Sequence, residues 1–468
     1  MNLIRLAIVL SMAFLIASCT KEPNNILKLS TWLTTTDKIH LLEKQSEINF
    51  TDSAQTTFIL ETDTAQKFQK MEGFGYALTG GSAMLIHTQL SEKNRKTLLR
   101  ELFSNDSSAI GISYLRITIG GSDLDELLFT YDDLPAGKTD PALRNFNLSY
   151  DTLHLIPLLK EILEINPDIK IMASPWTAPT WMKTNRAFKG GSLLPEFYEV
   201  YAQYFVKYIK EMAKYGIAIH AVTPQNEPEN PKNTPSLVMT AEEQLVFIRD
   251  HLAPKFSENS IKSEIVIFDH NADHPDYPLH ILKDSIARYS IAGTAFHLYL
   301  GEIQALSEVY QQYPDKKIYF TEQWTSGTGD FGGDLDWHIK NLIIGAPKNY
   351  STTVLEWNLA NDPQFGPHTD DGGCNLCLGA LTIHADSVSR NVSYYIIAHA
   401  SKFVPPGSVR IFSSEVEGFP NVAFLTPDGK RVMIVMNETG SAAEFDLNFG
   451  GKFAQLKLDP GSVATLLW

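Results

Sequence analysis

The 468-residue sequence predicts an α/β protein in which a (β/α)8 TIM barrel carries an antiparallel β-sandwich side domain built from both chain ends. Between residues 69 and 400, eight short apolar runs recur, and each is followed by a loop rich in Gly, Pro, Asn or aromatic residues and then by a helical pattern. Eight is the number of parallel strands that closes such a barrel. Alternating apolar and polar residues before and after this region predict the β-domain.

The chain begins with a segment that is typical of exported proteins. Arg5 precedes the apolar run 6–17, which is too short to span a bilayer as a mature helix, so residues 1–18 are interpreted as a signal peptide. The small residues before Cys19 match a bacterial lipobox, which predicts cleavage before Cys19 and lipidation of its thiol. An uncleaved anchor and cleavage elsewhere are the alternatives. With lipidation, the expected location is the bacterial outer membrane, at its surface or periplasmic face.

The remaining elements follow in chain order. Residues 19–25 are polar and include a proline, which indicates a tether, and residues 26–68 contain alternating segments that are too few to bury a sheet face alone. We therefore expect these strands to join the C-terminal β-domain. Residues 69–400 form the predicted barrel, with strands expected in KMEGFGYALTGG, ISYLRITIGG, IKIMASPWTAP, IHAVTPQNEP, EIVIFDHNAD, TAFHLYLG, KIYFTEQWTS and TTVLEWNLAND. Residues 401–468 alternate again, with a turn at Pro460-Gly461, and form the predicted β-sandwich.

The composition narrows the range of partners. Lys and Arg number 39 against 54 for Asp and Glu, a net charge of −15, and no long basic block is present, so nucleic acid is not an expected partner. A neutral substrate fits an acidic surface better, and we expect a monomer. One cluster rich in acidic and histidine side chains fits no standard metal-ligand spacing, so we interpret it as a solvated loop and expect no metal or other cofactor. Its members are Asp269, His270, Asp273, His274 and His280.

The sequence contains three cysteines. If Cys19 carries the lipid, Cys374 and Cys377 remain, in the glycine-rich stretch GGCNLCLG. In an exported protein these two can form a small disulfide loop. We rank structural pairing first, two free thiols second, and redox or metal chemistry third.

Polar and aromatic residues close the apolar runs. Because the active site of a parallel barrel lies at the C-terminal ends of its strands, these residues are the candidates for the site. In chain order they are Arg116, Trp176, Asn226, Glu227, His297, Tyr299, Glu322, Trp324, Glu356, Trp357 and Asn358. Glu227 and Glu322 close the fourth and seventh runs, from which their side chains can converge across the barrel mouth. Glu356 alternates with Trp357 to the opposite face and is interpreted as structural.

Paired carboxylates with aromatic walls are what the cleavage of a glycosidic bond requires. The leaving oxygen needs a proton, and the developing positive charge at the anomeric carbon needs an anion, so an acid and a nucleophile about 5 to 5.5 Å apart cleave the bond with retention. We expect Glu322 to be the nucleophile, kept ionised by hydrogen bonds from His297 and Tyr299. Glu227, in a proline-walled and less polar loop, is the expected acid, its pKa raised when sugar covers it.

Seven stretches carry a resemblance to a known family: MEGFGYALTGGSA, YLRITIGGSDL, ASPWTAPTWMKTNRAFKGGSL, AVTPQNEPEN, FTEQW, EWNLANDPQFGP and HASKFVPPGSVRI. Through them the chain resembles glycoside hydrolase family 30, which contains bacterial β-1,6-glucanases and glucosylceramidases. The resemblance implies that Glu227 is the general acid/base and Glu322 the nucleophile. It also implies that a sugar in the −1 subsite is surrounded by Arg116, Trp176, Asn226, His297, Tyr299 and Trp357. Trp324 and Trp181 are walls of outer subsites or core residues.

One departure from the family separates its branches. Where glucosylceramidases have an aspartate after FGxxxT that contacts the outer hydroxyls of glucose, this chain has Thr79-Gly80-Gly81. Together with the GGCNLCLG loop, this difference favours an endo-β-1,6-glucanase that acts on β-1,6-glucan by double displacement. The alternatives are a glucosylceramidase, a broad β-glucosidase or β-xylosidase of the same family, and, from another class, a non-catalytic glycan-binding lipoprotein.

Overall fold

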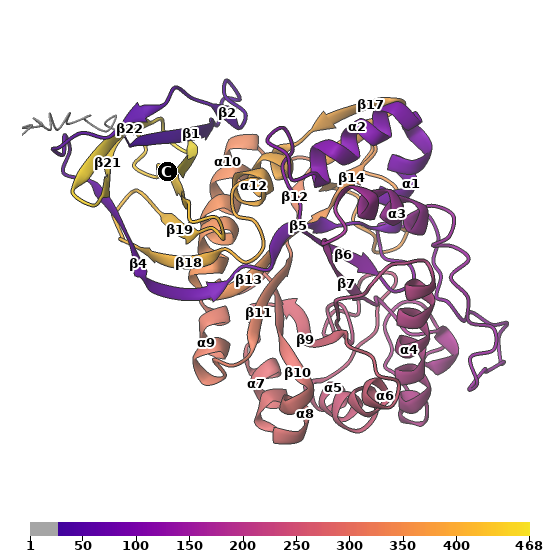
Figure 1. Ribbon diagram of the computed structural model, residues 1–468. Coiled ribbons are helices and arrows are strands. Elements are labelled where there is room, and N and C mark those ends of the chain that lie inside the picture. The colour runs from indigo at the N-terminus through magenta and orange to yellow at the C-terminus, as the bar shows by residue number, and fades with distance from the viewer. Residues whose placement is uncertain (1–26) are drawn as a thin grey trace, which may run out of the picture.

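The computed structural model describes residues 27–468 as a barrel with a β-domain beside it (Figure 1). The signal peptide, the tether and Cys19 lie outside the described residues. Among the described residues, no helix has the length and apolar character that a membrane span requires.

Eight parallel strands close the barrel, and each overlaps one of the eight expected runs, which confirms the predicted fold class. In chain order they are β5 (Gly73–Ala77), β6 (Tyr114–Thr118), β7 (Lys170–Ser174), β8 (Ala221–Val222), β9 (Glu264–Asn271), β10 (Ile291–His297), β11 (Lys317–Glu322) and β13 (Ser351–Asn358). Each strand pairs with the next, and β13 pairs with β5 to complete the ring.

Helices between the strands surround the barrel (Figure 1). They are α1 (Gly80–Gln89), α2 (Glu92–Phe103), α3 (Leu155–Ile165), α4 (Tyr198–Lys214), α5 (Ala241–Val246), α6 (Ala253–Glu258), α7 (Asp276–Lys283), α8 (Ser285–Ser290), α9 (Ala305–Gln312), α10 (Phe331–His338), α11 (Ala346–Lys348) and α12 (Val392–Ser401). In α4, Tyr201, Tyr204, Phe205 and Tyr208 recur at helical spacing and are all buried, because this face packs against the barrel core.

The barrel interior is filled with side chains below the active-site end. One layer consists of Tyr114, Met172, Ala221, Val266, Ala295, Tyr319 and Leu355, all completely buried and contributed by seven of the strands. At the N-terminal end of the strands, Lys317 donates to Glu72 at 2.7 Å and to Glu264 at 2.7 Å. Since packing and ion pairs occupy the interior and this end, we expect the substrate at the C-terminal ends of the strands.

The β-domain is built from both chain ends, as the sequence predicts. Its N-terminal strands are β1 (Lys28–Thr34), β2 (Glu43–Lys44), β3 (Ile48–Asn49) and β4 (Ile59–Lys70), and its C-terminal strands are β18 (Val409–Ser413), β19 (Asn421–Leu425), β20 (Arg431–Met436), β21 (Ala443–Phe449), β22 (Lys452–Leu458) and β23 (Val463–Leu467). β1 pairs with β23, and β4 lies between β18 and β21. One pair departs from the antiparallel expectation: β4 is antiparallel to β18 but parallel to β21, because these two neighbours run in opposite directions.

Short strands that follow β11 and β13 form two small sheets. β12 (Thr325–Ser326) pairs with β15 (Cys377–Leu378), and β14 (Ala360–Asn361) pairs with β16 (Leu381–His384), which pairs in turn with β17 (Ser387–Arg390). Cys374 and Cys377 form a disulfide bond, which is the pairing that the sequence ranks first. This segment follows β13, so it begins at the end of the barrel where the candidate site residues lie.

Candidate active site

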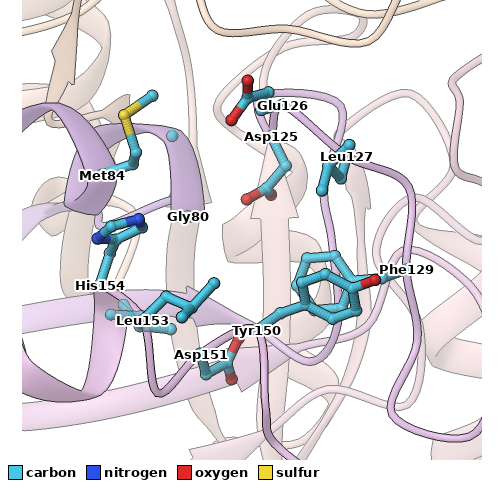
Figure 2. A pocket seen from close by; sticks show the side chains of 12 residues that line it. Gly80, Met84, Asp125, Glu126, Leu127, Phe129, Tyr150, Asp151, Leu153 and His154 are labelled. Atoms are coloured by element: carbon cyan, nitrogen blue, oxygen red, sulfur yellow. The ribbon is translucent and has the colours of Figure 1, made fainter.

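Two cavities open near the C-terminal ends of the strands. The first is lined by Gly80, Asp125, Tyr150 and their neighbours and contains neither strand-end glutamate (Figure 2). A Cβ atom at Gly80 would lie 1.8 Å from Oδ1 of Asp125. Gly80, which follows β5 at the start of α1, lines this cavity and not the one that contains the glutamates, and its interpretation as a branch-specific difference stays a prediction.

The second cavity, which we call the glutamate pocket, has a volume of about 370 Å³, a size typical of small-ligand sites. Its lining residues are Asp123, Trp176, Glu227, Asn230, Asn233, Asn271, Tyr299, Leu300, Glu322, Trp324, Trp357, Cys374 and Cys377. The strand register brings these ends together, because Asn271, His297 and Glu322 are cross-strand neighbours at the ends of β9, β10 and β11. Glu227 and Glu322 thus meet in one pocket with three tryptophans.

Glu227 sits on a strained turn that directs it into the glutamate pocket. β8 ends at Val222, and Glu227 has a backbone φ of 45°, in the left-handed region that residues with a Cβ rarely adopt. Its backbone N–H donates to the carbonyl of Asp269 at 2.9 Å, which holds the turn against β9. The side-chain amides of Asn230 and Asn233 donate to Oε2 at 2.7 and 3.1 Å. Glu227 therefore shapes a turn and also presents a carboxylate to the pocket.

Glu322 ends β11 with both oxygens held. The Tyr299 hydroxyl donates to Oε1 at 2.9 Å, and the Arg116 guanidinium donates to Oε2. The side chain is only slightly exposed to the pocket. These two donors fix the position of the carboxylate, as a nucleophile requires.

Arg116 is completely buried beneath the pocket and connects several site residues. Besides Glu322, it donates to Oδ1 of Asn226 at 2.5 Å and to Oδ2 of Asp269 at 2.8 Å. Because Oδ1 of Asn226 is taken by Arg116, its Nδ2 group is the end that can donate to a ligand. Trp176 and Trp357 stack on each other with ring centroids 5.3 Å apart, and the guanidinium lies 5.0 Å from the Trp176 ring.

Asp269 lies at the centre of the buried network, where the sequence predicts a solvated loop. It is completely buried and accepts hydrogen bonds from Arg116, Ser174, Thr223 and Thr321. The prediction is wrong for Asp269 and for His270 because β9 continues to Asn271. Phe268 and Asp269 have positive φ values of 72° and 65°, which break the alternation by which a strand is recognised in sequence.

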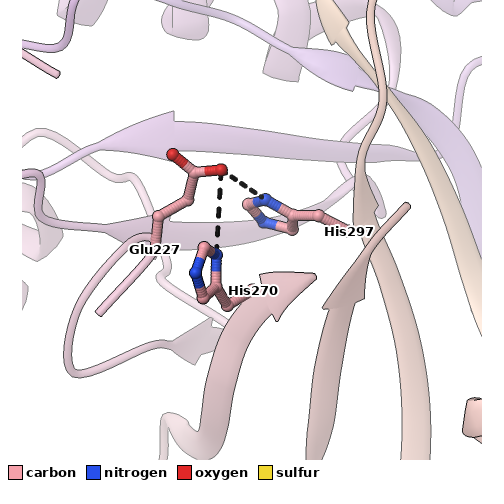
Figure 3. Close-up of side chains that lie close together, drawn as sticks. All are labelled: Glu227, His270 and His297. Carbon is pink, nitrogen blue, oxygen red and sulfur yellow. Dashed lines mark ion pairs between the residues drawn. The ribbon is translucent and has the colours of Figure 1, made fainter. Parts of the chain in front are cut away.

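His297 lies among three carboxylates, of which Figure 3 shows Glu227. Its Nδ1 is 3.5 Å from Oε1 of Glu227 and 3.6 Å from Oε1 of Glu322, and its Nε2 is 3.1 Å from Oδ1 of Asp269. Burial opposes the charged ring, but the neighbouring carboxylates outweigh it and raise the pKa of His297 to about 9. Figure 3 also shows the His270 ring directed at the same oxygen of Glu227, at 3.8 Å. Both histidines contact carboxylates in ion-pair geometry, so we interpret this cluster as an ion-pair network.

The two glutamates have opposite pKa shifts in the free protein. Burial acts to raise the pKa of Glu227, but His297, His270 and Asn230 outweigh it, so the pKa is lowered. Burial raises the pKa of Glu322, and His297 and Arg116 offset only part of that effect. The expectation of a less polar loop around Glu227 is wrong, because two asparagine amides and two histidines contact it.

Asp123 is a site residue that the sequence interpretation missed. It lines the glutamate pocket and is only 5% exposed. Burial, with repulsion from Glu322 and Glu227, raises its pKa to about 8. Its signal in the sequence is its position, directly after the second apolar run in GGSDL. Its carbonyl accepts from the backbone N–H of Thr369 at 2.9 Å, which ties it to the disulfide segment.

The other strand-end candidates divide between pocket and core. Trp324 lines the glutamate pocket, whereas Trp181 is buried in the main core and donates from Nε1 to the carbonyl of Asp132 at 2.9 Å. Glu356 points away from the pocket and contacts Nδ1 of His338 at 2.7 Å. Its neighbour Trp357 faces the pocket, as strand alternation requires.

Comparison with known proteins gives the same assignment for both domains. The model of the glycosyl hydrolase family 30 TIM-barrel domain matches residues 71–404, and that of the family 30 beta sandwich domain matches residues 407–466. The endo-1,6-beta-D-glucanase BGN16.3 of Trichoderma harzianum is 33% identical, with 81% of this chain and 80% of the relative covered. The lysosomal acid glucosylceramidase of Mus musculus is 31% identical, with 88% and 84% covered. The solved structure of the endo-beta1,6-glucanase BT3312 superposes with a TM-score of 0.86 at 33% identity, covering 94% of this chain and 99% of that chain.

Proposed function

The chain belongs to glycoside hydrolase family 30, whose members are retaining enzymes, and from this premise we propose that it is an endo-β-1,6-glucanase acting on β-1,6-glucan. The observation that carries the catalytic part of the proposal is the pair Glu227 and Glu322, both within 3.6 Å of one imidazole nitrogen at the barrel mouth. Their nearest oxygens can therefore be no farther apart than the sum of those two contacts, which accommodates the spacing of a retaining pair.

In the first step, Glu322 attacks the anomeric carbon while Glu227 protonates the leaving oxygen. Arg116 and Tyr299 hold the Glu322 carboxylate, so little reorganisation is needed as its charge passes into the new ester bond. The free Nδ2 of Asn226 donates to the sugar 2-hydroxyl, a contact that strengthens at the transition state. In the second step Glu227 removes a proton from water, which attacks the anomeric carbon and releases Glu322.

Charge balance explains how Glu227 acquires its proton although its pKa is low in the free protein. With all groups ionised, three carboxylates face only two cations, Arg116 and His297, so the buried network carries one excess negative charge. Bound sugar displaces water and makes this excess less favourable, so the network takes up one proton. Glu322 keeps its charge because Arg116 and Tyr299 donate to it. The proton goes to Glu227, whose lowered pKa in the free protein depends on its contacts with His297, His270 and Asn230.

The choice of β-1,6-glucan is supported by the relatives. Three fungal proteins named endo-1,6-beta-D-glucanase are 31–33% identical to this chain over 81% of its length, and the structural neighbour BT3312 bears the same activity in its name. The tryptophans Trp176, Trp324 and Trp357 form apolar pocket walls against which sugar faces stack.

The test of the reaction follows the first anomer released from a short β-1,6-linked glucan by proton NMR. Retention predicts the β-anomer, and initial release of the α-anomer would refute the double displacement. Absence of any release would favour the non-catalytic glycan-binding protein. Parallel assays on β-1,3- and β-1,4-glucans, glucosylceramide and aryl β-glucosides test the linkage; faster turnover of any of these substrates would contradict the β-1,6 assignment.

Substitutions separate the two roles. Glu322→Gln is expected to abolish turnover of every glycoside, whereas Glu227→Ala keeps glycosylation by substrates with good leaving groups and recovers with azide. General acid assistance is worth about 10² to 10⁴ in rate, so the contrast is measurable. Glu356→Gln is the matched control, since Glu356 is also a strand-end glutamate but points away from the pocket. Equal losses in the Glu227 and Glu322 variants on an activated aryl glycoside would overturn the roles.

We also propose that the protein is an exported lipoprotein anchored through Cys19 in the outer membrane. The support is the signal-like segment with its lipobox cysteine. Cys19→Ala is expected to move the protein from the membrane fraction to the soluble fraction and to abolish incorporation of labelled fatty acid. Membrane association of this variant equal to that of the wild type would contradict the proposal.

A further inference from the structure

The cavity beside Gly80 is separate from the glutamate pocket and has no role in the reaction described above (Figure 2). We call it the loop cavity, because most of its lining comes from residues 119–155, the loop between β6 and α3 and the first residue of that helix. Its volume is about 100 Å³, which is less than the roughly 300–1,000 Å³ of a small-ligand cleft, so a ligand bound here is only partly enclosed.

Three carboxylates line the loop cavity, Asp125, Glu126 and Asp151. Among residues 27–468, the buried pair Asp125 and Asp151 each have one oxygen without a hydrogen-bond partner. Asp125 is 5% exposed, and its Oδ2 accepts from the backbone N–H and the hydroxyl of Ser122 at 2.7 and 2.8 Å, which leaves Oδ1 free. Asp151 is 4% exposed, and its Oδ2 accepts from the Tyr131 hydroxyl at 2.6 Å, which leaves its Oδ1 free. Both side chains are therefore fixed by one oxygen and available to a ligand through the other.

Gly80 makes room for the first of these oxygens. Since a Cβ at this position would lie 1.8 Å from Oδ1 of Asp125, any other residue would displace the carboxylate or fill the space. The neighbouring Gly81 also lies close to the loop, because a Cβ at this position would be 2.3 Å from the carbonyl oxygen of Leu124. The paired glycines thus allow α1 to approach the loop while the cavity stays open.

The opposite wall is apolar and partly exposed. The Tyr150 and Phe129 rings lie 4.5 Å apart between centroids, and Tyr150 is 45% exposed. Leu127 and Leu153 beside them are 53% and 57% exposed. An aromatic face next to fixed hydrogen-bond acceptors matches the two sides of a pyranose ring, which presents C–H groups on its faces and hydroxyls at its edge.

The protonation of the acids also suits a neutral ligand. Burial raises the pKa of Asp125 to about 6 and that of Asp151 to about 7. Near neutral pH the pair therefore carries less than its full negative charge, and each carboxyl can donate to or accept from a hydroxyl group. An anionic ligand is disfavoured by the same carboxylates.

The loop cavity lies next to the glutamate pocket. Asp123 lines the glutamate pocket, while Asp125, two residues later, lines the loop cavity. Between them, the carbonyl of Leu124 accepts from the backbone N–H of Gly81 at 3.2 Å, which fixes the loop to α1. The two cavities are therefore neighbours along this segment of the loop, and a polymer bound in one passes close to the other.

We propose that the loop cavity is a secondary binding site for a β-linked glucan chain, which holds the polymer on the barrel beside the active site. The inference deepens the proposed function and depends on it for the identity of the polymer. A site of this kind increases the effective concentration of polymer at the glutamate pocket and does not alter the chemical step.

The test compares Tyr150→Ala with Tyr150→Phe, which keeps the ring, and with Tyr289→Ala. Tyr289 is 91% exposed on α8 and controls for the loss of a surface tyrosine. Tyr150→Ala is expected to raise the KM for long β-1,6-glucan about five-fold, equivalent to about 1 kcal/mol, with kcat/KM on an aryl β-glucoside unchanged. The two control variants are expected to match the wild type on both substrates, and the thermal midpoint of each variant verifies folding.

A second measurement does not require turnover. In a Glu322→Gln background, retention of the protein on insoluble β-1,6-glucan is expected to fall about five-fold with Tyr150→Ala and to stay constant with Tyr150→Phe. Unchanged retention and an unchanged polymer KM in Tyr150→Ala would overturn the secondary site. Failure of the wild type to cleave any glycoside would instead refute the proposed function, and the retention assay would still decide whether the cavity binds glucan.

Discussion

Replacing His297 with glutamine is expected to remove a pH-dependent part of the protein's stability. His297 is completely buried, and its two ring nitrogens lie 3.1 to 3.6 Å from the carboxylates of Asp269, Glu227 and Glu322. Burial acts against the imidazolium, but these carboxylates raise its pKa from 6.5 to about 9. At about 1.4 kcal/mol for each pKa unit, this shift corresponds to about 3 kcal/mol of folding free energy.

The sign follows from proton linkage. Between pH 6.5 and about 9 the folded protein holds a proton on His297 that the unfolded chain has released. The stabilisation is therefore complete below pH 6.5 and is lost as pH rises toward about 9. His297→Gln lacks this contribution, so its free energy of unfolding is expected to fall less steeply with pH, by about 1.4 kcal/mol for each unit within that window. At pH 6 the variant is expected to be less stable by about 3–5 kcal/mol, because three buried carboxylates lose a cation.

The assay is urea unfolding of wild type and variant at pH 6, 7, 8 and 9. Other groups that titrate in this range are present in both proteins, so the difference between the two curves is the quantity to read. His399→Gln is the buried control. Burial lowers the pKa of His399 to about 3, so it is neutral throughout the range, and its loss removes contacts of 2.8 Å to Thr34 and Thr465 at every pH. A His297→Gln curve parallel to that of the wild type between pH 7 and 9 would refute the charged-histidine account.

Three further predictions concern the glutamate pocket. Tyr299→Phe removes the hydroxyl that donates to Glu322 at 2.9 Å. We expect kcat/KM to fall about ten- to a hundred-fold, as for a hydrogen bond to a charged group. An increase in KM with kcat unchanged would contradict this prediction. Cys374 and Cys377, which form the disulfide, line the pocket, so its reduction is expected to raise KM more than it lowers kcat. The assay compares activity with and without a phosphine reductant. The thermal midpoint is expected to change little, because the ring that the disulfide closes is short. Trp176→Ala is expected to lower the free energy of unfolding by about 3–5 kcal/mol, measured by urea titration, because a large buried ring is lost.

Much of the fold is encoded locally. A short apolar run that ends at a loop predicts each barrel strand, and such a run can be recognised from neighbouring residues alone. The position of Glu227 and Glu322 at the ends of their runs follows from the same pattern, since parallel strands in a barrel place their C-terminal ends together. The pairing of both chain ends in one β-domain was also predictable, because the N-terminal strands are too few to bury a face alone.

Sequence by itself therefore determined the barrel, the two-ended β-domain and the pair of strand-end glutamates, because periodicity and strand-end position are properties of contiguous residues. Only the tertiary structure decided which groups surround those glutamates. Asp269 enters the network through left-handed backbone that no alternation pattern predicts, and Gly80 faces a second cavity instead of the glutamate pocket. The polarity around a buried carboxylate is the sum of contacts from strands far apart in the chain, and those contacts exist only when the barrel is closed.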